Sequence, residues 1–167
     1  MTYQASCERN GDYSDHVLLL GASCVAIATL VPVAMYQVGA ISKLPDPPFR
    51  VFDSERITTS SAAHPFGIPD GLLGIASFST TLTLALLSRR SKTANKLLGA
   101  KLVFDASSAA FNAGRQVVSF GKLCSWCTGT ALSAGVMAYA GRNSIREVLH
   151  DAASIAQSVT SSLQRKV

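Results

Sequence analysis

Charged side chains are scarce in this chain of 167 residues, at 15% of the total, against about 25% in typical soluble domains. The charges that do occur are separated by long uncharged stretches. This scarcity disfavours intrinsic disorder, a coiled coil and an ordinary water-soluble domain. The hydrophobic content of 48% and the mean hydropathy of +0.28 favour a membrane protein instead.

The chain also has few residues that could bind metal. It contains four cysteines and three histidines, with neither a second Cys-x-x-Cys motif nor a histidine pair at ligand spacing, so no metal site is expected. No basic stripe with interleaved aromatic residues occurs, so no nucleic-acid partner is expected. No βαβ pattern surrounds the one Cys-x-x-Cys motif, which excludes a soluble thioredoxin-like domain.

Three stretches of about 18 or more residues carry no formal charge, which is typical of membrane-spanning helices. They are 17–42, 71–88 and 123–141. The first is too long for a signal peptide and follows several acidic residues, so we interpret it as a retained anchor. Pro32 within it is compatible with a kinked membrane helix.

A fourth segment, 97–120, is harder to assign, because Lys101, Asp105, Asn112 and Arg115 interrupt its apolar pattern. A soluble helical hairpin is the alternative. The tight connections on either side, however, require this segment to cross as well. Its many small residues suit close packing in lipid, and Lys101 and Asp105 can pair at positions i and i+4. We therefore predict an all-α integral membrane four-helix bundle, with spans at about 17–41, 68–88, 97–119 and 123–141.

Lysine and arginine set the expected orientation. Nine of them lie in the termini and the second connection, against four in the first and third connections. The N-terminal segment 1–16 and the tail 143–167 are therefore predicted to be cytoplasmic. The tail places apolar residues on one face of a helix, which favours the membrane surface or a partner, with a frayed tail as the alternative.

The connection 43–70 is the one long loop outside the predicted spans. Its LPDPPF sequence is stiff and extended, and Asp53 or Ser54 can cap a short helix lying on the membrane surface. Pro69 and Asp70 stand where the next helix begins, and Asp70 is favourable at the positive end of that helix. A plain N-terminal cap is one interpretation of Asp70.

Redox chemistry is expected in GKLCSWCTGTA, at the start of the last predicted span. Cys124 and Cys127 can close a small disulfide and can occupy the first turn of a helix, where amide groups favour a thiolate. Such a dithiol most simply exchanges two electrons. A structural disulfide is the main alternative, although so small a loop stabilises little. Cys24 is expected to be a small buried side chain, and Cys7 is expected to lie out of reach of the pair.

Four spans, an outer loop with a surface helix, FGIPDGLLG opening the second span and CSWC opening the fourth resemble the vitamin K epoxide reductase family in its bacterial form, over roughly 17–142. The resemblance implies a multi-pass protein of the bacterial inner membrane, with CSWC at the periplasmic face. It implies that Cys127 meets a membrane quinone, menaquinone or ubiquinone, held between the helices. It also implies that Cys124 exchanges with another disulfide, and that a periplasmic thioredoxin-like protein is a candidate partner.

The resemblance also points to a quinone site. Asp70 matches the position where the family usually carries an Asn that hydrogen-bonds a quinone carbonyl. An ionised carboxylate there would repel a quinone oxyanion, whereas a protonated one would donate to it. Phe66, Phe78 and Trp126 are candidate apolar walls for the quinone; general packing is the alternative, or an interfacial anchor for Trp126. Ala131 stands where some relatives carry a Tyr.

One departure from the family lies in the loop. Relatives usually carry a further cysteine pair there, and this chain has no cysteine between Cys24 and Cys124. Either a partner thiol attacks the Cys124–Cys127 disulfide directly, or the chain has kept the scaffold without the complete cycle. We predict a membrane thiol–disulfide oxidoreductase that couples this dithiol to a quinone and supports disulfide formation in exported proteins. The alternatives are a non-catalytic scaffold with a structural disulfide, and exchange between proteins without a quinone.

Overall fold

The computed structural model of the chain describes residues 2–164 and places the side chains of 12–158, 160, 161 and 164. The side chain of Cys7 and the last three residues of the predicted tail lie outside this description. Within residues 2–164 the regular structure is helical, without a β-strand. The α-helices are α1 (Thr2–Gln37), α2 (Ser54–Thr58), α3 (Asp70–Ser88), α4 (Lys92–Phe120), α5 (Ser125–Ala140) and α6 (Arg142–Gln164).

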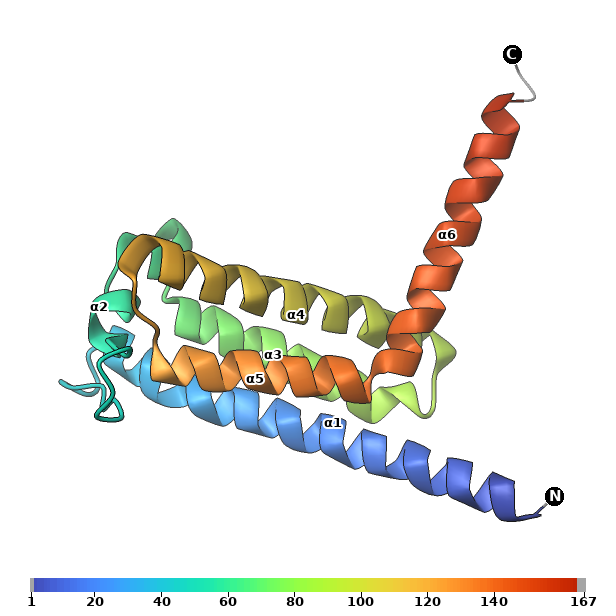
Figure 1. Cartoon of the computed structure of the whole chain (residues 1–167), viewed down its shortest axis with the longest axis horizontal. Coiled ribbons are helices and arrows are strands. Elements are labelled where there is room, and N and C mark those ends of the chain that lie inside the picture. The colour runs from blue at the N-terminus through green and yellow to red at the C-terminus, as the bar shows by residue number, and fades with distance from the viewer. Residues whose placement is uncertain (1, 165–167) are drawn as a thin grey trace.

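Helices α1, α3, α4 and α5 lie side by side along one common direction (Figure 1). Helix α1 packs against both α3 and α5, and α4 closes the bundle by packing against the same two helices. Apolar side chains from all four helices form one buried core, among them Ala26, Phe78, Leu102 and Met137. Small residues allow close approach, because a Cβ on Gly71 would lie 2.9 Å from the backbone nitrogen of Ala34.

Among the described residues, two helices are long and apolar enough to cross a membrane, namely α1 over Asp12–Gln37 and α3 over Asp70–Ser88. The other two long bundle helices differ from them in composition or length. Polar residues such as Lys101 and Asp105 lower the hydropathy of α4, and α5 has 16 residues, whereas a span needs about 20. The membrane crossing of α4 and α5 therefore stays a prediction.

The predicted pairing of Lys101 with Asp105 is confirmed. The Lys101 ammonium donates to the Asp105 carboxylate, which is 4% exposed. From α3, the hydroxyls of Ser77 and Thr81 also donate to this carboxylate, at 3.1 and 2.6 Å. A buried charge is tolerated when it is paired and hydrogen-bonded, so this cluster holds α3 against α4 without an unpaired carboxylate.

The long loop folds over one end of the bundle (Figure 1). Asp53 caps α2, as one of the two predicted caps, and accepts a hydrogen bond from the backbone nitrogen of Arg56 at 3.3 Å. Helix α3 begins at Asp70, directly after Pro69. The cap position of α3 is Pro69 rather than Asp70, so the interpretation of Asp70 as a plain N-terminal cap is wrong.

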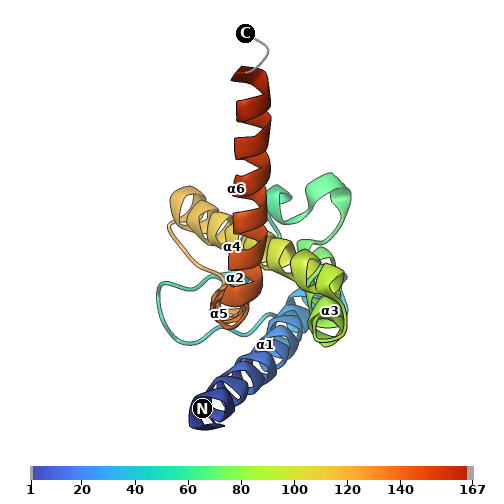
Figure 2. The ribbon, with the colours of Figure 1, turned by 90° about the vertical axis from the view of Figure 1, so that its right-hand side faces the viewer.

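Helix α6 begins at the opposite end of the bundle and runs steeply across its long axis (Figures 1 and 2). Three polar contacts attach it to α4. Ser144 donates to Asn95 at 2.6 Å, Asn95 donates to Glu147 at 2.8 Å, and Lys96 pairs with Asp151 at 2.6 Å.

The expectation that Cys24 is buried is wrong, because its side chain is exposed on the outer face of α1. Its neighbour Ser23 points inward and is fully buried. Successive residues of a helix are rotated by about 100°, so the inward position of Ser23 directs Cys24 outward.

Candidate dithiol site

The two cysteines of the motif occupy the first turn of α5, in agreement with the sequence. Cys124 is the N-cap residue, and its sulfur accepts a hydrogen bond from the backbone nitrogen of Cys127 at 3.1 Å. The preceding helix, α4, is capped at its C-terminal end by Gly121, whose positive φ of 59° closes the turn that leads into the motif. This conformation suits glycine, because it has no Cβ to clash in the left-handed region.

The loop covers the side of the motif on which Cys124 lies. Backbone hydrogen bonds join Leu123 to both Val51 and Asp53, at 2.9 and 3.0 Å. Cys124 itself is 0% exposed, and the side chain of Ser54 lies within hydrogen-bonding reach of it. The first thiol of the motif is therefore shielded by loop residues.

A carboxylate clasp, formed by Asp46, Ser54 and Ser125, fastens this loop to α5. The hydroxyls of Ser54 and Ser125 donate to the Asp46 carboxylate at 2.5 and 2.6 Å, and the Ser54 backbone nitrogen donates to it at 2.7 Å. The Ser125 backbone nitrogen donates in turn to the Ser54 hydroxyl at 3.0 Å. Burial acts to raise the pKa of Asp46, but these hydrogen bonds outweigh burial and hold the pKa below its ordinary value;.

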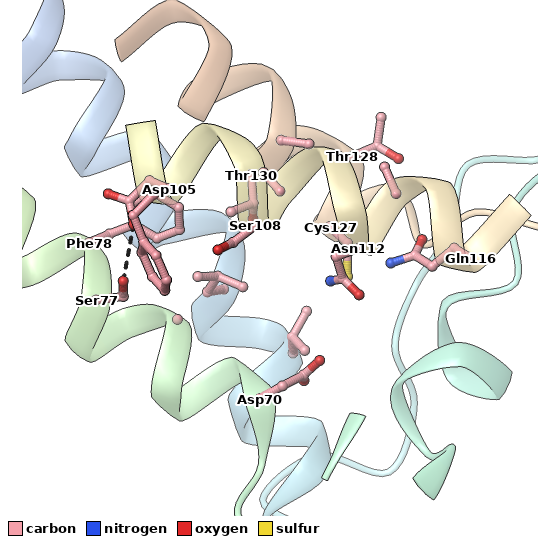
Figure 3. Close-up of a pocket in the computed structure, with 17 residues that line it drawn as sticks. Asp70, Ser77, Phe78, Asp105, Ser108, Asn112, Gln116, Cys127, Thr128 and Thr130 are labelled. Atoms are coloured by element: carbon pink, nitrogen blue, oxygen red, sulfur yellow. Dashed lines mark hydrogen bonds between the residues drawn. The ribbon is translucent and has the colours of Figure 1, made fainter. Parts of the chain in front are cut away.

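Cys127 faces the other way, into a pocket between the four bundle helices (Figure 3). The pocket has a volume of about 170 Å³, and a protein cavity of roughly 150 Å³ is known to bind benzene. Apolar side chains form much of the wall, including Leu30, Val33 and Phe78. The pocket thus offers an aromatic ring a place beside a thiol.

The comparisons with known proteins agree with this geometry. A family model described as the vitamin K epoxide reductase family matches residues 16–140, which include the dithiol, the loop, α1 from residue 16 onward and all of α3, α4 and α5. The chain belongs to the vitamin K epoxide reductase family. No curated protein and no solved structure matches the chain. Members of this family are membrane oxidoreductases that use quinones, so the chain is a membrane-associated oxidoreductase in this general sense.

The structure brings together some of the site residues expected from the family resemblance. Asp70 and Phe78 line the pocket with Cys127, and Ala131 does so as well. Phe66 lies outside it, fully exposed in the short turn before α3. Trp126 does not line the pocket either, because its indole nitrogen donates to the Pro45 carbonyl at 3.0 Å on the loop side.

Three polar residues at the site were not singled out from the sequence as site residues. Gln116 and Asn112 of α4 line the pocket beside Cys127, and Gln37 of α1 donates to the Asp70 carboxylate at 2.7 Å. One sequence signal for the α4 residues was available, because positions 112 and 116 share a helix face and are polar within a stretch of small and apolar residues. Among the described residues, no group of three or more potential ligand side chains lies close enough to hold a metal ion.

Proposed function

We propose that this protein passes electrons between the Cys124–Cys127 dithiol and a membrane quinone, and so supports disulfide formation in exported proteins. One observation carries the proposal. Cys127 opens onto a pocket that fits an aromatic ring, whereas Cys124 lies on the loop side of the same helix turn. This arrangement gives each thiol a different partner, a small ring for Cys127 and a protein thiol or disulfide for Cys124.

The reaction balances with the dithiol alone as reductant. The Cys127 sulfur, as a thiolate, first adds to the quinone ring, which takes up a proton. The Cys124 thiolate then attacks the Cys127 sulfur, so that the S–S bond forms as the bond between Cys127 and the ring breaks. Two electrons and two protons pass to the quinone, which leaves as the quinol. The Cys127 backbone nitrogen donates to the Cys124 sulfur, and such a donor at a helix N-terminus favours the thiolate needed for this attack.

The pocket walls supply the binding surface for the ring. Leu30, Val33 and Phe78 would contact its faces and edges, and Asp70 lies at the same pocket. Menaquinone and ubiquinone both present a quinone ring to such walls, so the proposal includes either as the oxidant. The structural disulfide considered from the sequence does not account for a pocket that opens at Cys127.

We further propose that α1, α3, α4 and α5 all cross the bacterial inner membrane, with the loop in the periplasm and both termini in the cytoplasm. The alignment of the four helices along one common axis, with successive helices antiparallel, supports this, as does the pairing of Lys101 with Asp105, which reduces the cost of charges in lipid. Because α6 runs steeply across the bundle axis, it would then lie along the cytoplasmic surface, with the exposed Leu149 and Ile155 toward lipid;.

A protein partner must reach Cys124 in the absence of loop cysteines. Cys124 is shielded by the loop, so a periplasmic thioredoxin-like protein would attack it only when the carboxylate clasp opens. The clasp would therefore control the access of such a partner to Cys124.

A thiol count tests the proposed activity. The reduced, detergent-purified protein is alkylated and analysed by mass spectrometry before and after excess menadione, a naphthoquinone. We expect two thiols to be lost in the parent and in Cys24→Ser, the control at the exposed cysteine, and none in Cys127→Ala. If the thiols of the folded parent survive the quinone, the scaffold function or quinone-independent exchange replaces this proposal.

Topology is tested separately by labelling single cysteines introduced at Ser61 and Ser91. The four-span arrangement requires them to react from opposite sides of the membrane. Labelling of both from the same side would contradict it.

A further inference from the structure

One oxygen of the Asp70 carboxyl group is committed as a hydrogen-bond acceptor. The side-chain oxygen of Gln37 accepts a hydrogen bond from the backbone nitrogen of Gly71 at 3.0 Å. A backbone nitrogen only donates, so this bond fixes the orientation of the Gln37 amide and directs its nitrogen to Asp70, at 2.7 Å. The Oδ1 atom of Asp70 is therefore held as an acceptor by Gln37 and cannot donate to a carbonyl oxygen;.

Gln116 presents the opposite chemistry to the same pocket. Its side chain is 3% exposed and its oxygen accepts a hydrogen bond from the Cys124 backbone nitrogen at 3.0 Å. Because the Cys124 backbone nitrogen only donates, it must face the Gln116 oxygen, and this fixes the orientation of the Gln116 amide;. The Gln116 nitrogen is directed toward Cys127 and the pocket (Figure 3).

Asn112 lies one helical turn before Gln116 and is oriented in a similar way. Its side-chain oxygen accepts a hydrogen bond from the Arg115 guanidinium at 3.0 Å, and a guanidinium has no acceptor. The guanidinium is itself anchored to the Ala62 carbonyl at 3.2 Å. The Asn112 amide nitrogen is consequently free to donate into the pocket that this side chain lines.

We propose that Gln116 and Asn112 form an amide pair that donates hydrogen bonds to the carbonyl oxygen of the quinone and to the negative charge that develops on it. This inference rests on the proposed function. Residues four apart on a helix share a face, so both nitrogens can approach one oxygen beside Cys127. Neutral donors oriented before the reaction stabilise a developing oxyanion, whereas a carboxylate at Asp70 would repel it in its ionised form.

The amide pair predicts a preference among ligands. A ring that carries a carbonyl oxygen gains these hydrogen bonds, whereas a hydrocarbon of the same size gains only contacts with the apolar walls. Menadione and 2-methylnaphthalene form such a matched pair of probes. We expect the amide pair to strengthen the binding of menadione and to leave the binding of 2-methylnaphthalene unchanged.

Gln116→Glu and Asn112→Asp test the proposal in the full-length protein. Each change keeps the side-chain shape and the oxygen that accepts from Cys124 or Arg115, and replaces the donating nitrogen with oxygen. Loss of one oxyanion donor costs on the order of 10²-fold in rate, so we expect each variant to reduce menadione about 10- to 100-fold more slowly. Gln157→Glu, the same change on the exposed part of α6, serves as the control and should match the parent.

An infrared measurement separates a donor role from a structural one. In the parent, hydrogen bonds should lower the carbonyl stretching frequency of bound, ¹³C-labelled menadione, and each variant should shift that band back upward. The affinity for 2-methylnaphthalene should be the same in both variants as in the parent. Slower turnover without a band shift, or an equal loss of affinity for the hydrocarbon, would overturn the proposal.

The remaining outcomes are also decisive. If the parent reduces menadione and both variants match it, the amide pair is overturned and the proposed function stands. A parent that neither binds nor reduces any quinone overturns both. If Gln116→Glu fails to fold, Asn112→Asp alone tests whether the amide pair donates to the quinone. The Asn112 oxygen accepts from Arg115 and not from the Cys124 backbone, so this variant leaves the dithiol turn intact.

Discussion

Cys124 and Cys127 lie three residues apart and face two different environments. Cys124 is buried beneath a polar loop, close to Ser54 and next to the carboxylate clasp. Cys127 opens onto a largely apolar pocket between helices. The first turn of α5 separates these environments, so a disulfide that forms and breaks there can connect a polar partner outside the bundle with an apolar partner inside it.

The largest expected effect comes from removing either thiol. Because the two sulfurs act as a unit, Cys124→Ala and Cys127→Ala should each lower menadione reduction on the order of 10³-fold or more. Steady-state absorbance assays with excess reductant measure this. Cys24→Ser should leave the rate unchanged, because that side chain points away from the core on α1. A Cys124→Ala variant with normal turnover would contradict the division of roles between the two cysteines.

Opening the loop should expose Cys124 without changing the pocket. Asp46→Asn removes a charge that accepts three hydrogen bonds, and a bond to a charged group contributes about 1.5–3 kcal/mol. Iodoacetamide should therefore alkylate Cys124 roughly 10- to 100-fold faster, in a protein whose other cysteines are replaced by serine. Asp53→Asn is the matched control, because Asn also caps helices well; an equal acceleration in this variant would exclude a specific role for the clasp.

Filling the pocket should impair only the Cys127 side. Ala109→Leu adds bulk to the pocket wall, and overpacking typically costs 1–3 kcal/mol. We expect KM for menadione to rise about 10-fold, while dithiothreitol still reduces the Cys124–Cys127 disulfide at the parental rate. Ala110→Leu places the same bulk on the exposed face of α4 and should change neither value. Slower reduction by dithiothreitol in Ala109→Leu would show that the two sides are not independent.

The smallest effect concerns pH. The pKa of Asp46 is lower in the folded protein than its ordinary value, so the clasp contributes stability above the unfolded-state pKa of about 3.9 and loses it as pH falls through the folded value. The reactivity of Cys124 toward 4,4′-dithiodipyridine, divided by that in Asp46→Asn at the same pH to cancel the ionisation of thiol and reagent, should thus stay low and constant from about pH 5 to 8 and rise only below about pH 4. At low pH the ratio should approach one, because the protonated clasp of the parent then resembles that of Asp46→Asn. A rise in this ratio already between pH 5 and 7 would assign the gating to another group.

The sequence predicted much of the fold because its signals are local. Pro69 and Asp70 marked the start of α3, Asp53 was one of two caps expected for α2, and the spacing of Lys101 and Asp105 predicted their ion pair. Each of these features depends on residues within one or two helical turns of one another. Cys24 was assigned to the interior because an apolar segment shows little difference between its inward and outward faces.

The pocket could be predicted only in part. The position of Asp70 in the FGIPD motif identified it as a pocket residue. Phe78 was one of several apolar candidates, and it does line the pocket. Phe66 and Trp126 were equally apolar and equally near the motifs in sequence, yet the turn before α3 and the loop contact at Pro45 place them elsewhere. Composition does not specify the direction in which a side chain leaves a turn.

The sequence by itself determined a membrane-associated, all-helical chain with a dithiol at a helix start, because hydropathy and Cys-x-x-Cys spacing are local properties. Only the tertiary structure decided which polar groups meet that dithiol. Asp46 reaches Ser125 across 79 residues and Gln37 reaches Asp70 across 33, while Gln116 turns its amide toward Cys127 because the Cys124 backbone holds its oxygen. Such contacts depend on the rotation and packing of whole helices and on the path of the loop, which no short stretch of sequence specifies.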